Sequence, residues 1–209
     1  MSLYEQISEA VIKGRANDVS TLTEQALKEK LPPQDILDNA LLAGMAVIGE
    51  RFKRNDVFVP EVLISARALS KGTDLLKDHL QEGGAKPIGK AVIATVAGDL
   101  HDIGKNLVKL MLEGAGFQVI DLGIDVPPET IAAETKENEP DILALSALLS
   151  TTMGAQKDTI DAVKEVGYRD KVKIIVGGAP ITQNFADEIG ADGYAADAAT
   201  AAEIAKSLV

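Results

Sequence analysis

The sequence contains no cysteine and no tryptophan, and only 3 % of its 209 residues are aromatic. Without cysteine the chain cannot form disulfides, thiolate-ligated zinc sites, iron–sulfur clusters or a nucleophilic thiol. A cysteine-free composition fits a reducing compartment, so we expect a cytoplasmic location. Because aromatic side chains are scarce, any large flat ligand would be held mainly by aliphatic groups, glycine backbone and polar contacts.

Long apolar runs and an excess of positive charge are also absent. No stretch of about 18 apolar residues is present, so we expect no membrane-spanning helix. The N-terminal residues lack a basic region followed by an apolar one, so we expect no signal peptide. Asp and Glu number 32 against 21 Lys and Arg, which gives a formal net charge of −11. That balance argues against nucleic acid and anionic membrane surfaces as partners.

The first 85 residues show helical periodicity throughout, with apolar residues three and four positions apart. Pro33 and Pro60 stand where two of these helices would begin. Four helices with short connections predict an antiparallel four-helix bundle in residues 1–85. The stretch from Gln81 to Pro87 is rich in glycine and polar residues and is the predicted linker, with Gly83-Gly84 as a hinge.

After the linker, short apolar runs alternate with helical segments, which predicts an α/β domain over residues 86–209. Nearly unbroken apolar strands indicate a parallel sheet covered by helices on both faces. We therefore expect a doubly wound, flavodoxin- or Rossmann-like domain with five parallel strands. The expected strands are 90–97, 118–122, 141–147, 172–177 and 192–195, and the expected helices are 104–115, 128–138, 152–166, 182–189 and 198–208.

One of the two histidines of the chain, His101, lies where the first expected strand passes into a helix. The carboxyl ends of parallel strands form the crevice in which α/β proteins bind ligands. Asp99 precedes this histidine by two residues, a spacing that suits a metal-ligating imidazole whose second nitrogen is held by an acid. No further histidine, cysteine or suitably spaced carboxylates complete a protein-only metal site. A metal at His101 would therefore arrive with most of its ligands in place.

The other strand ends carry polar and glycine residues that each have an ordinary structural explanation. Ser150, Thr151 and Thr152 could form an N-cap cluster, and Asp99 itself could cap a helix. Gly177-Gly178 could be only a tight turn. Taken together, these positions lie on one edge of the sheet and can line a single crevice.

The sequence strongly resembles the cobalamin-binding module of methionine synthase and the corrinoid proteins of methyltransferase systems. Three elements carry the resemblance, namely Asp99-x-His101-x-x-Gly104, Ser146-x-Leu148 and Gly177-Gly178. The segment Gly49–Pro60 also matches the helical cap of that family. The resemblance therefore spans essentially the whole chain.

The resemblance implies that cobalamin is bound base-off, with His101 replacing the lower base of the cofactor as axial cobalt ligand. Asp99 would accept a hydrogen bond from His101 Nδ1, and Thr152 would support Asp99. Ser146 and Leu148 would contact the nucleotide tail, whereas Phe52 and Val59 would cover the upper face of the corrin. The full expected set of cofactor-binding residues is Asp99, His101, Asp102, Ile103, Gly104, Ser146, Leu148, Ser150, Thr152, Gly177, Gly178, Tyr194, Phe52 and Val59.

The function implied by the resemblance is methyl carriage without independent catalysis. Cob(I)alamin would accept a methyl group on a substrate-specific methyltransferase and deliver it, as methyl-Co(III), to a second, folate- or thiol-directed methyltransferase. A reductive activator is a further expected partner. The methyl donor would be a methoxylated aromatic (as in an O-demethylase), a methylamine or methanol. The alternatives are a cobalamin-responsive regulator, an adenosylcobalamin mutase subunit, and a flavodoxin-like protein with another ligand.

Overall fold

The computed structural model describes residues 1–82 and 87–209. They form two compact units, one helical and one built around a sheet. The predicted hinge at Gly83-Gly84 and the predicted boundary between residues 85 and 86 lie outside the described residues. In the described part of the chain, no helix is both long and apolar enough to cross a membrane.

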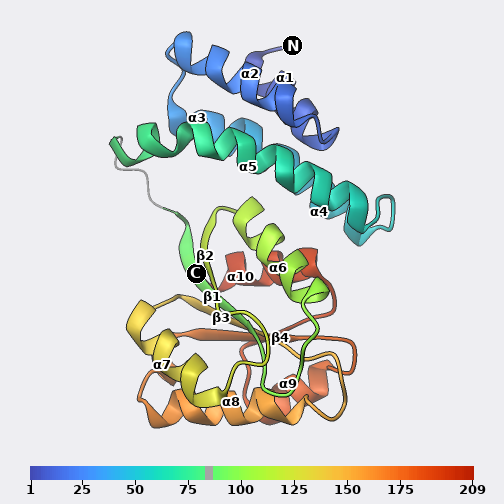
Figure 1. Ribbon diagram of the computed structural model, residues 1–209, viewed down its shortest axis with the longest axis vertical. Coiled ribbons are helices and arrows are strands. Elements are labelled where there is room, and N and C mark those ends of the chain that lie inside the picture. Colours follow the sequence, from blue (N-terminus) through green and yellow to red (C-terminus); the bar gives the residue numbers. More distant parts are fainter. Residues whose placement is uncertain (83–86) are drawn as a thin grey trace. The chain divides into compact units, whose positions relative to one another are not determined.

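The helical unit contains four helical segments within residues 1–82 (Figure 1). The first opens with a capping box, in which Ser2 and Glu5 bond each other's backbone N–H groups. The third runs without a break through residues 33–53 and includes one stretch of π-helix. The elements are α1 (Leu3–Ile12), α2 (Ala16–Lys28), α3 (Pro33–Ile36), the π-helix η1 (Leu37–Leu42), α4 (Ala43–Lys53) and α5 (Val59–Glu82).

The α/β unit is built on a five-stranded parallel sheet in the order β2-β1-β3-β4-β5, which confirms the predicted architecture. Each strand is followed by a helix, as the alternation of apolar runs predicts. The strands are β1 (Gly89–Thr95), β2 (Phe117–Asp121), β3 (Ile142–Ser146), β4 (Lys173–Gly177) and β5 (Gly193–Ala195). The helices are α6 (Ile103–Gly114), α7 (Pro128–Asn138), α8 (Gly154–Glu165), α9 (Gln183–Ile189) and α10 (Ala198–Leu208), with a 3₁₀ turn at Arg169–Lys171.

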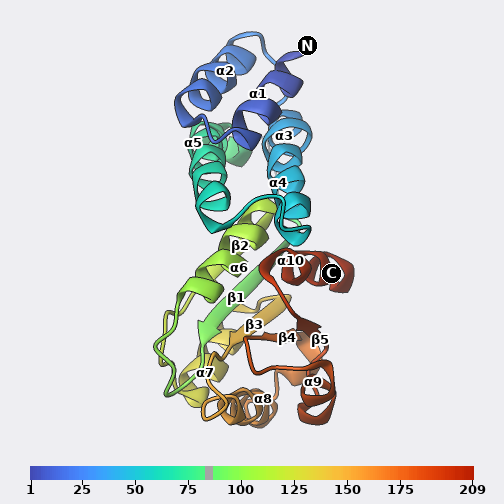
Figure 2. The ribbon, with the colours of Figure 1, turned by 90° about the vertical axis from the view of Figure 1, so that its right-hand side faces the viewer.

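Helices cover both faces of this sheet, as Figures 1 and 2 show. On one face α7, α8 and α9 enclose a core that includes Leu145 of β3 and Val176 of β4. Side chains alternate along a strand, so Ser146 points to the other face, which α6 and α10 cover. All five strands run in the same direction, so the loops that follow them gather at one edge. The residues predicted to bind a cofactor in this unit lie mainly in those loops.

Candidate functional site

Asp99 is the centre of the site, in the loop that follows β1. Its side chain is completely buried, and both of its oxygens accept hydrogen bonds. Oδ1 accepts from the backbone nitrogen of His101 (3.0 Å) and from Nδ1 of the same residue (2.7 Å). Oδ2 accepts from Leu148 N (2.7 Å), Leu149 N (3.3 Å) and Thr152 Oγ1 (2.7 Å). The carboxylate therefore joins the loop after β1 to the loop after β3.

These hydrogen bonds keep Asp99 ionised. Burial acts to raise the pKa of its carboxyl, but the hydrogen bonds from Thr152, His101 and Leu148 outweigh burial and hold the pKa well below its usual range. An ionised carboxylate can only accept, so Nδ1 of His101 must carry the proton in their shared hydrogen bond. When the ring carries only this proton, Nε2 has a free lone pair, and this is the form of imidazole that binds a metal ion.

His101 is held at its backbone and open at its ring. Thr95 Oγ1 donates a hydrogen bond to the carbonyl oxygen of His101 (3.0 Å), whereas 51 % of the His101 side chain is exposed. Large apolar side chains, 41 % to 71 % exposed, lie in the loops after β1, β2 and β3 and at the start of α6. They are Leu100, Ile103, Ile124, Leu148 and Leu149. An imidazole bordered by exposed apolar side chains suits a large, mainly apolar ligand that presents a metal.

The two adjacent glycines at the end of β4 are required by the packing of the protein itself. Gly178 has a φ of +129°, and a Cβ there would overlap the carbonyl oxygen of Ala147. A Cβ on Gly177 would lie 2.9 Å from the carbonyl oxygen of Ala195. The backbone conformation and the carbonyl oxygen of Ala147 therefore explain Gly178, and the close approach of β5 explains Gly177. Gly177 is also paired in register with Ser146, at the same edge as Asp99.

Gly104, in the first turn of α6, differs from these glycines. A Cβ at this position would meet no atom within 4 Å, and its φ is outside the left-handed region. Neither backbone conformation nor internal packing calls for glycine, and glycine inside a helix is less favourable than alanine. Gly104 lies three residues after His101, and the open space beside it would allow a bound group to approach the start of α6 closely.

The remaining predicted residues are less closely tied to the Asp99–His101 pair. Asp102 is exposed and accepts a hydrogen bond from the Asn106 side chain (3.2 Å), and Ser150 is exposed in the loop after β3. Tyr194 packs against the core on the sheet face covered by α7, α8 and α9, whereas Ser146 points to the opposite face. Its strand, β5, is separated from β1 by β3 and β4. Phe52 at the end of α4 and Val59 at the start of α5 are half-buried in the helical unit.

The loop after β2 holds residues that the sequence analysis missed. Asp125 bonds to the loop that carries Asp99, and Ile124 is one of the exposed apolar residues named above. A signal was available, because Asp125 follows its strand much as Asp99 follows β1.

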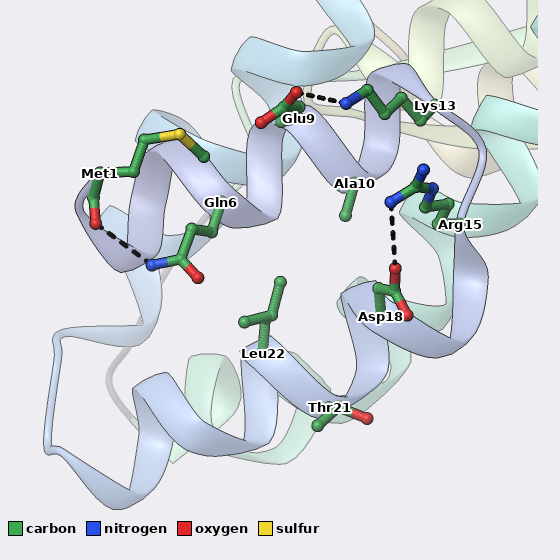
Figure 3. A pocket seen from close by; sticks show the side chains of 9 residues that line it. All are labelled: Met1, Gln6, Glu9, Ala10, Lys13, Arg15, Asp18, Thr21 and Leu22. Atoms are coloured by element: carbon green, nitrogen blue, oxygen red, sulfur yellow. Dashed lines mark hydrogen bonds and ion pairs between the residues drawn. The ribbon is translucent and has the colours of Figure 1, made fainter.

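A pocket of roughly 380 Å³ lies between α1 and α2 in the helical unit (Figure 3). Its charged side chains pair with each other, Glu9 with Lys13 and Arg15 with Asp18. The lining residues are Met1, Gln6, Glu9, Ala10, Lys13, Arg15, Asp18, Thr21 and Leu22. None of them was predicted to bind the cofactor.

The hydroxyl of Thr152 gives a first test of the Asp99 network. Thr152→Val removes a donor from a buried carboxylate and should lower the free energy of unfolding by about 1.5–3 kcal/mol, because hydrogen bonds to charged groups are worth that much. Thr152→Ser keeps the donor and should cost less than about 1 kcal/mol. Urea unfolding at pH 7 compares the two variants, and equal losses would show that packing, not the hydrogen bond, explains Thr152.

Comparison with known proteins places this geometry in a family. Two family models, each described as a B12 binding domain, match residues 89–203 and 3–77. A dimethylamine corrinoid protein of Methanosarcina barkeri is 44 % identical over 208 residues, which cover 99 % of this chain and 97 % of that protein.

Solved structures agree with this assignment over the whole chain. The methanol:cobalamin methyltransferase complex MtaBC of Methanosarcina barkeri matches with a TM-score of 0.88 and 34 % identity, over 98 % of this chain and 78 % of that one. A cobalamin-binding protein of Desulfitobacterium hafniense matches with a TM-score of 0.83 and 32 % identity, over 100 % and 99 %. The chain belongs to the cobalamin-binding corrinoid proteins of methyltransferase systems.

Proposed function

We propose that this corrinoid methyl carrier holds cobalamin base-off, with His101 as the lower axial ligand, and serves a methylamine-specific methyltransferase. The observation that carries the proposal is the 2.7 Å hydrogen bond between Asp99 and His101 Nδ1, beside a half-exposed ring. Bound cobalamin supplies, in its Co(I) state, a strong nucleophile for a methyl group. The protein supplies the axial nitrogen and the surroundings.

The residues around His101 fit a corrinoid. Asp99 orients the ring and raises the basicity of Nε2, since it shares the proton on Nδ1. The exposed apolar side chains, such as Leu100 and Ile103, would lie against the macrocycle and exclude water. Gly104 would let the cofactor approach the start of α6.

Ser146 and Leu148 are proposed to hold the nucleotide tail. Ser146 points to the sheet face covered by α6 and α10, where its neighbours in register are Thr95 of β1 and Gly177 of β4. Phe52 and Val59 of the helical unit are proposed to cover the upper face. The ring of Tyr194 packs into the core on the other side of the sheet, so among the proposed residues Tyr194 would contact the cofactor only near the end of β5.

The methylamine class is favoured by the relatives. Proteins named dimethylamine corrinoid proteins match this chain at 41 % to 44 % identity over nearly their whole length, whereas the methanol complex and a monomethylamine corrinoid protein each match at 34 %. The expected partners are a methylamine-specific methyltransferase, a second methyltransferase that takes the methyl group onward, and a reductive activator. The same relatives favour a carrier over a regulator or a mutase subunit.

Methyl transfer in a reconstituted system tests this proposal. The protein is loaded with cobalamin, reduced, and mixed in turn with dimethylamine, methanol and a methoxylated aromatic compound as methyl donors, each together with the methyltransferase specific for it. We expect methylation of the cofactor, followed by visible absorption, only with the dimethylamine enzyme. Methylation with one of the other two alone would overturn the substrate class. Retention of cobalamin without methylation by any of them would contradict the carrier role.

Gly104→Ala separates ligand approach from protein stability. Alanine at this helical position should raise the free energy of unfolding of the cobalamin-free protein by about 0.5–1 kcal/mol. The added methyl group should nevertheless weaken cobalamin binding, measured by equilibrium titration. A variant that binds cobalamin as tightly as the parent protein would remove Gly104 from the site.

A further inference from the structure

Asp125 makes a reciprocal pair of hydrogen bonds with the loop that carries Asp99. Its Oδ1 accepts a hydrogen bond from Gly98 N (2.7 Å), and its own backbone N–H donates to the carbonyl oxygen of Asp99 (3.0 Å). These bonds hold the two ends of the Gly98–Asp99 peptide segment. We propose that Asp125 is a positioning residue for the axial ligand, which it controls through Asp99; this inference rests on the proposed ligation of cobalt by His101.

The segment that carries Asp125 is fixed on both sides. Beyond the last residue of β2, the chain continues to bond β1, through Leu122 N to Ile93 O (2.9 Å) and Val126 N to Thr95 O (3.1 Å). Asp121 Oδ1 accepts from Gly123 N (3.0 Å) and from Lys105 Nζ (2.6 Å). Because Asp125 lies between these anchors, it can hold another loop in place.

Asp99 is therefore held both at its side chain and at its backbone. The loop after β3 bonds its carboxylate, through Leu148, Leu149 and Thr152, and the loop after β2 bonds its backbone. A rotation of the Asp99 backbone would move both carboxylate oxygens away from their donors. The hydrogen bond to His101 Nδ1 depends on that orientation, so loss of the Asp125 contact should loosen the ring.

The backbone conformation of Asp125 allows a clean separation of its possible roles. Its φ is +51°, in the left-handed region that Asp, Asn and Gly adopt most readily. Asp125→Gly removes the acceptor for Gly98 and keeps the conformation. Asp125→Asn keeps an acceptor oxygen and the conformation but removes the charge. Glu139→Gly is the matched control, because Glu139 also has a positive φ (+47°) but precedes β3, at the opposite edge of the sheet.

The first readout uses the cobalamin-free protein. Nitrogen-15 NMR of labelled histidine reports which ring nitrogen of His101 carries the proton, with His79 as the internal reference. We expect the Nδ1–H tautomer in the parent protein, in Asp125→Asn and in Glu139→Gly, and a mixture of tautomers in Asp125→Gly. The second readout is cobalamin affinity, which should fall about tenfold in Asp125→Gly alone, as is typical when a residue that supports a ligand is lost.

Three results would overturn the inference. In the first, Asp125→Gly retains the parent tautomer and the parent cobalamin affinity. In the second, cobalamin affinity falls as much in Asp125→Asn as in Asp125→Gly, which would assign the effect to the charge of Asp125. Should Asp125→Gly fail to fold, amide hydrogen exchange in the parent protein decides, since an unprotected Gly98 amide would contradict the contact. Failure of the proposed function would give a different result. The tautomers of His101 would then follow the expectation in the parent protein and in each variant, but His101 would not ligate cobalt.

Discussion

Replacing His101 by alanine should lower cobalamin affinity by at least about tenfold, because a cobalt-binding nitrogen is removed and even the loss of a supporting residue has that effect. The bound Co(II) form should also lose the electron paramagnetic resonance splitting that a protein nitrogen causes. The cobalamin-free variant should keep its fold, since half of the His101 side chain is exposed. Its free energy of unfolding should fall by about 1.5–3 kcal/mol, the usual worth of one hydrogen bond to a charged group.

His79→Ala is the matched control, because His79 is the other histidine of the chain and lies in α5 of the helical unit. It should change neither affinity nor spectrum. Equal affinity and an unchanged Co(II) spectrum in His101→Ala would contradict the assignment of His101 as the axial ligand.

Asp99→Asn should lower the free energy of unfolding by about 2–4 kcal/mol, the range expected when a buried, fully bonded charge loses its complementarity. All groups that contact the two carboxylate oxygens are donors, so the amide NH₂ of asparagine would face at least two of them. Urea unfolding of the cobalamin-free protein at pH 7 measures the loss. Asp102→Asn is the control, because Asp102 is exposed, and it should stay within about 0.5 kcal/mol of the parent protein. A loss equally small in Asp99→Asn would show that the network does not stabilise the site.

The same carboxylate makes stability depend on pH in a defined direction. Its pKa is lower in the folded than in the unfolded protein, so its contribution is present above the unfolded value of about 3.9 and is lost as pH falls toward the folded value. The difference in stability between the parent protein and Asp99→Asn should therefore shrink below about pH 4. A difference that stays constant as the solution is acidified would mean that Asp99 is not the group responsible.

The sheet and the central pair could be predicted because each depends on local signals. Apolar runs such as Ala91–Val96 mark buried strands, and Asp99 and His101 are close enough in sequence for their spacing to carry meaning. The network around them could not be predicted in full. The bond between Gly98 and Asp125 joins residues 27 positions apart, and the place of Asp125 after its strand does not indicate which residue it bonds.

Other features depend on three-dimensional packing that the sequence does not reveal. Gly104 and Gly178 look alike in the sequence, yet the first has open space around it and the second is forced by the carbonyl oxygen of Ala147. Tyr194 lies in a strand of only three residues, too short for an alternating pattern to indicate which face it occupies. The π-helical stretch at Leu37–Leu42 keeps apolar spacing close to that of an α-helix, so the predicted helix passes through it.

The most direct test of the central claim is electron paramagnetic resonance of the Co(II) form, prepared with and without nitrogen-15 in the histidines. The Asp99–His101 geometry predicts nitrogen splitting that changes from the nitrogen-14 pattern to the nitrogen-15 pattern when histidine is labelled. Splitting that the label leaves unchanged would mean that the cofactor keeps its own base. In that case His101 would not be the axial ligand.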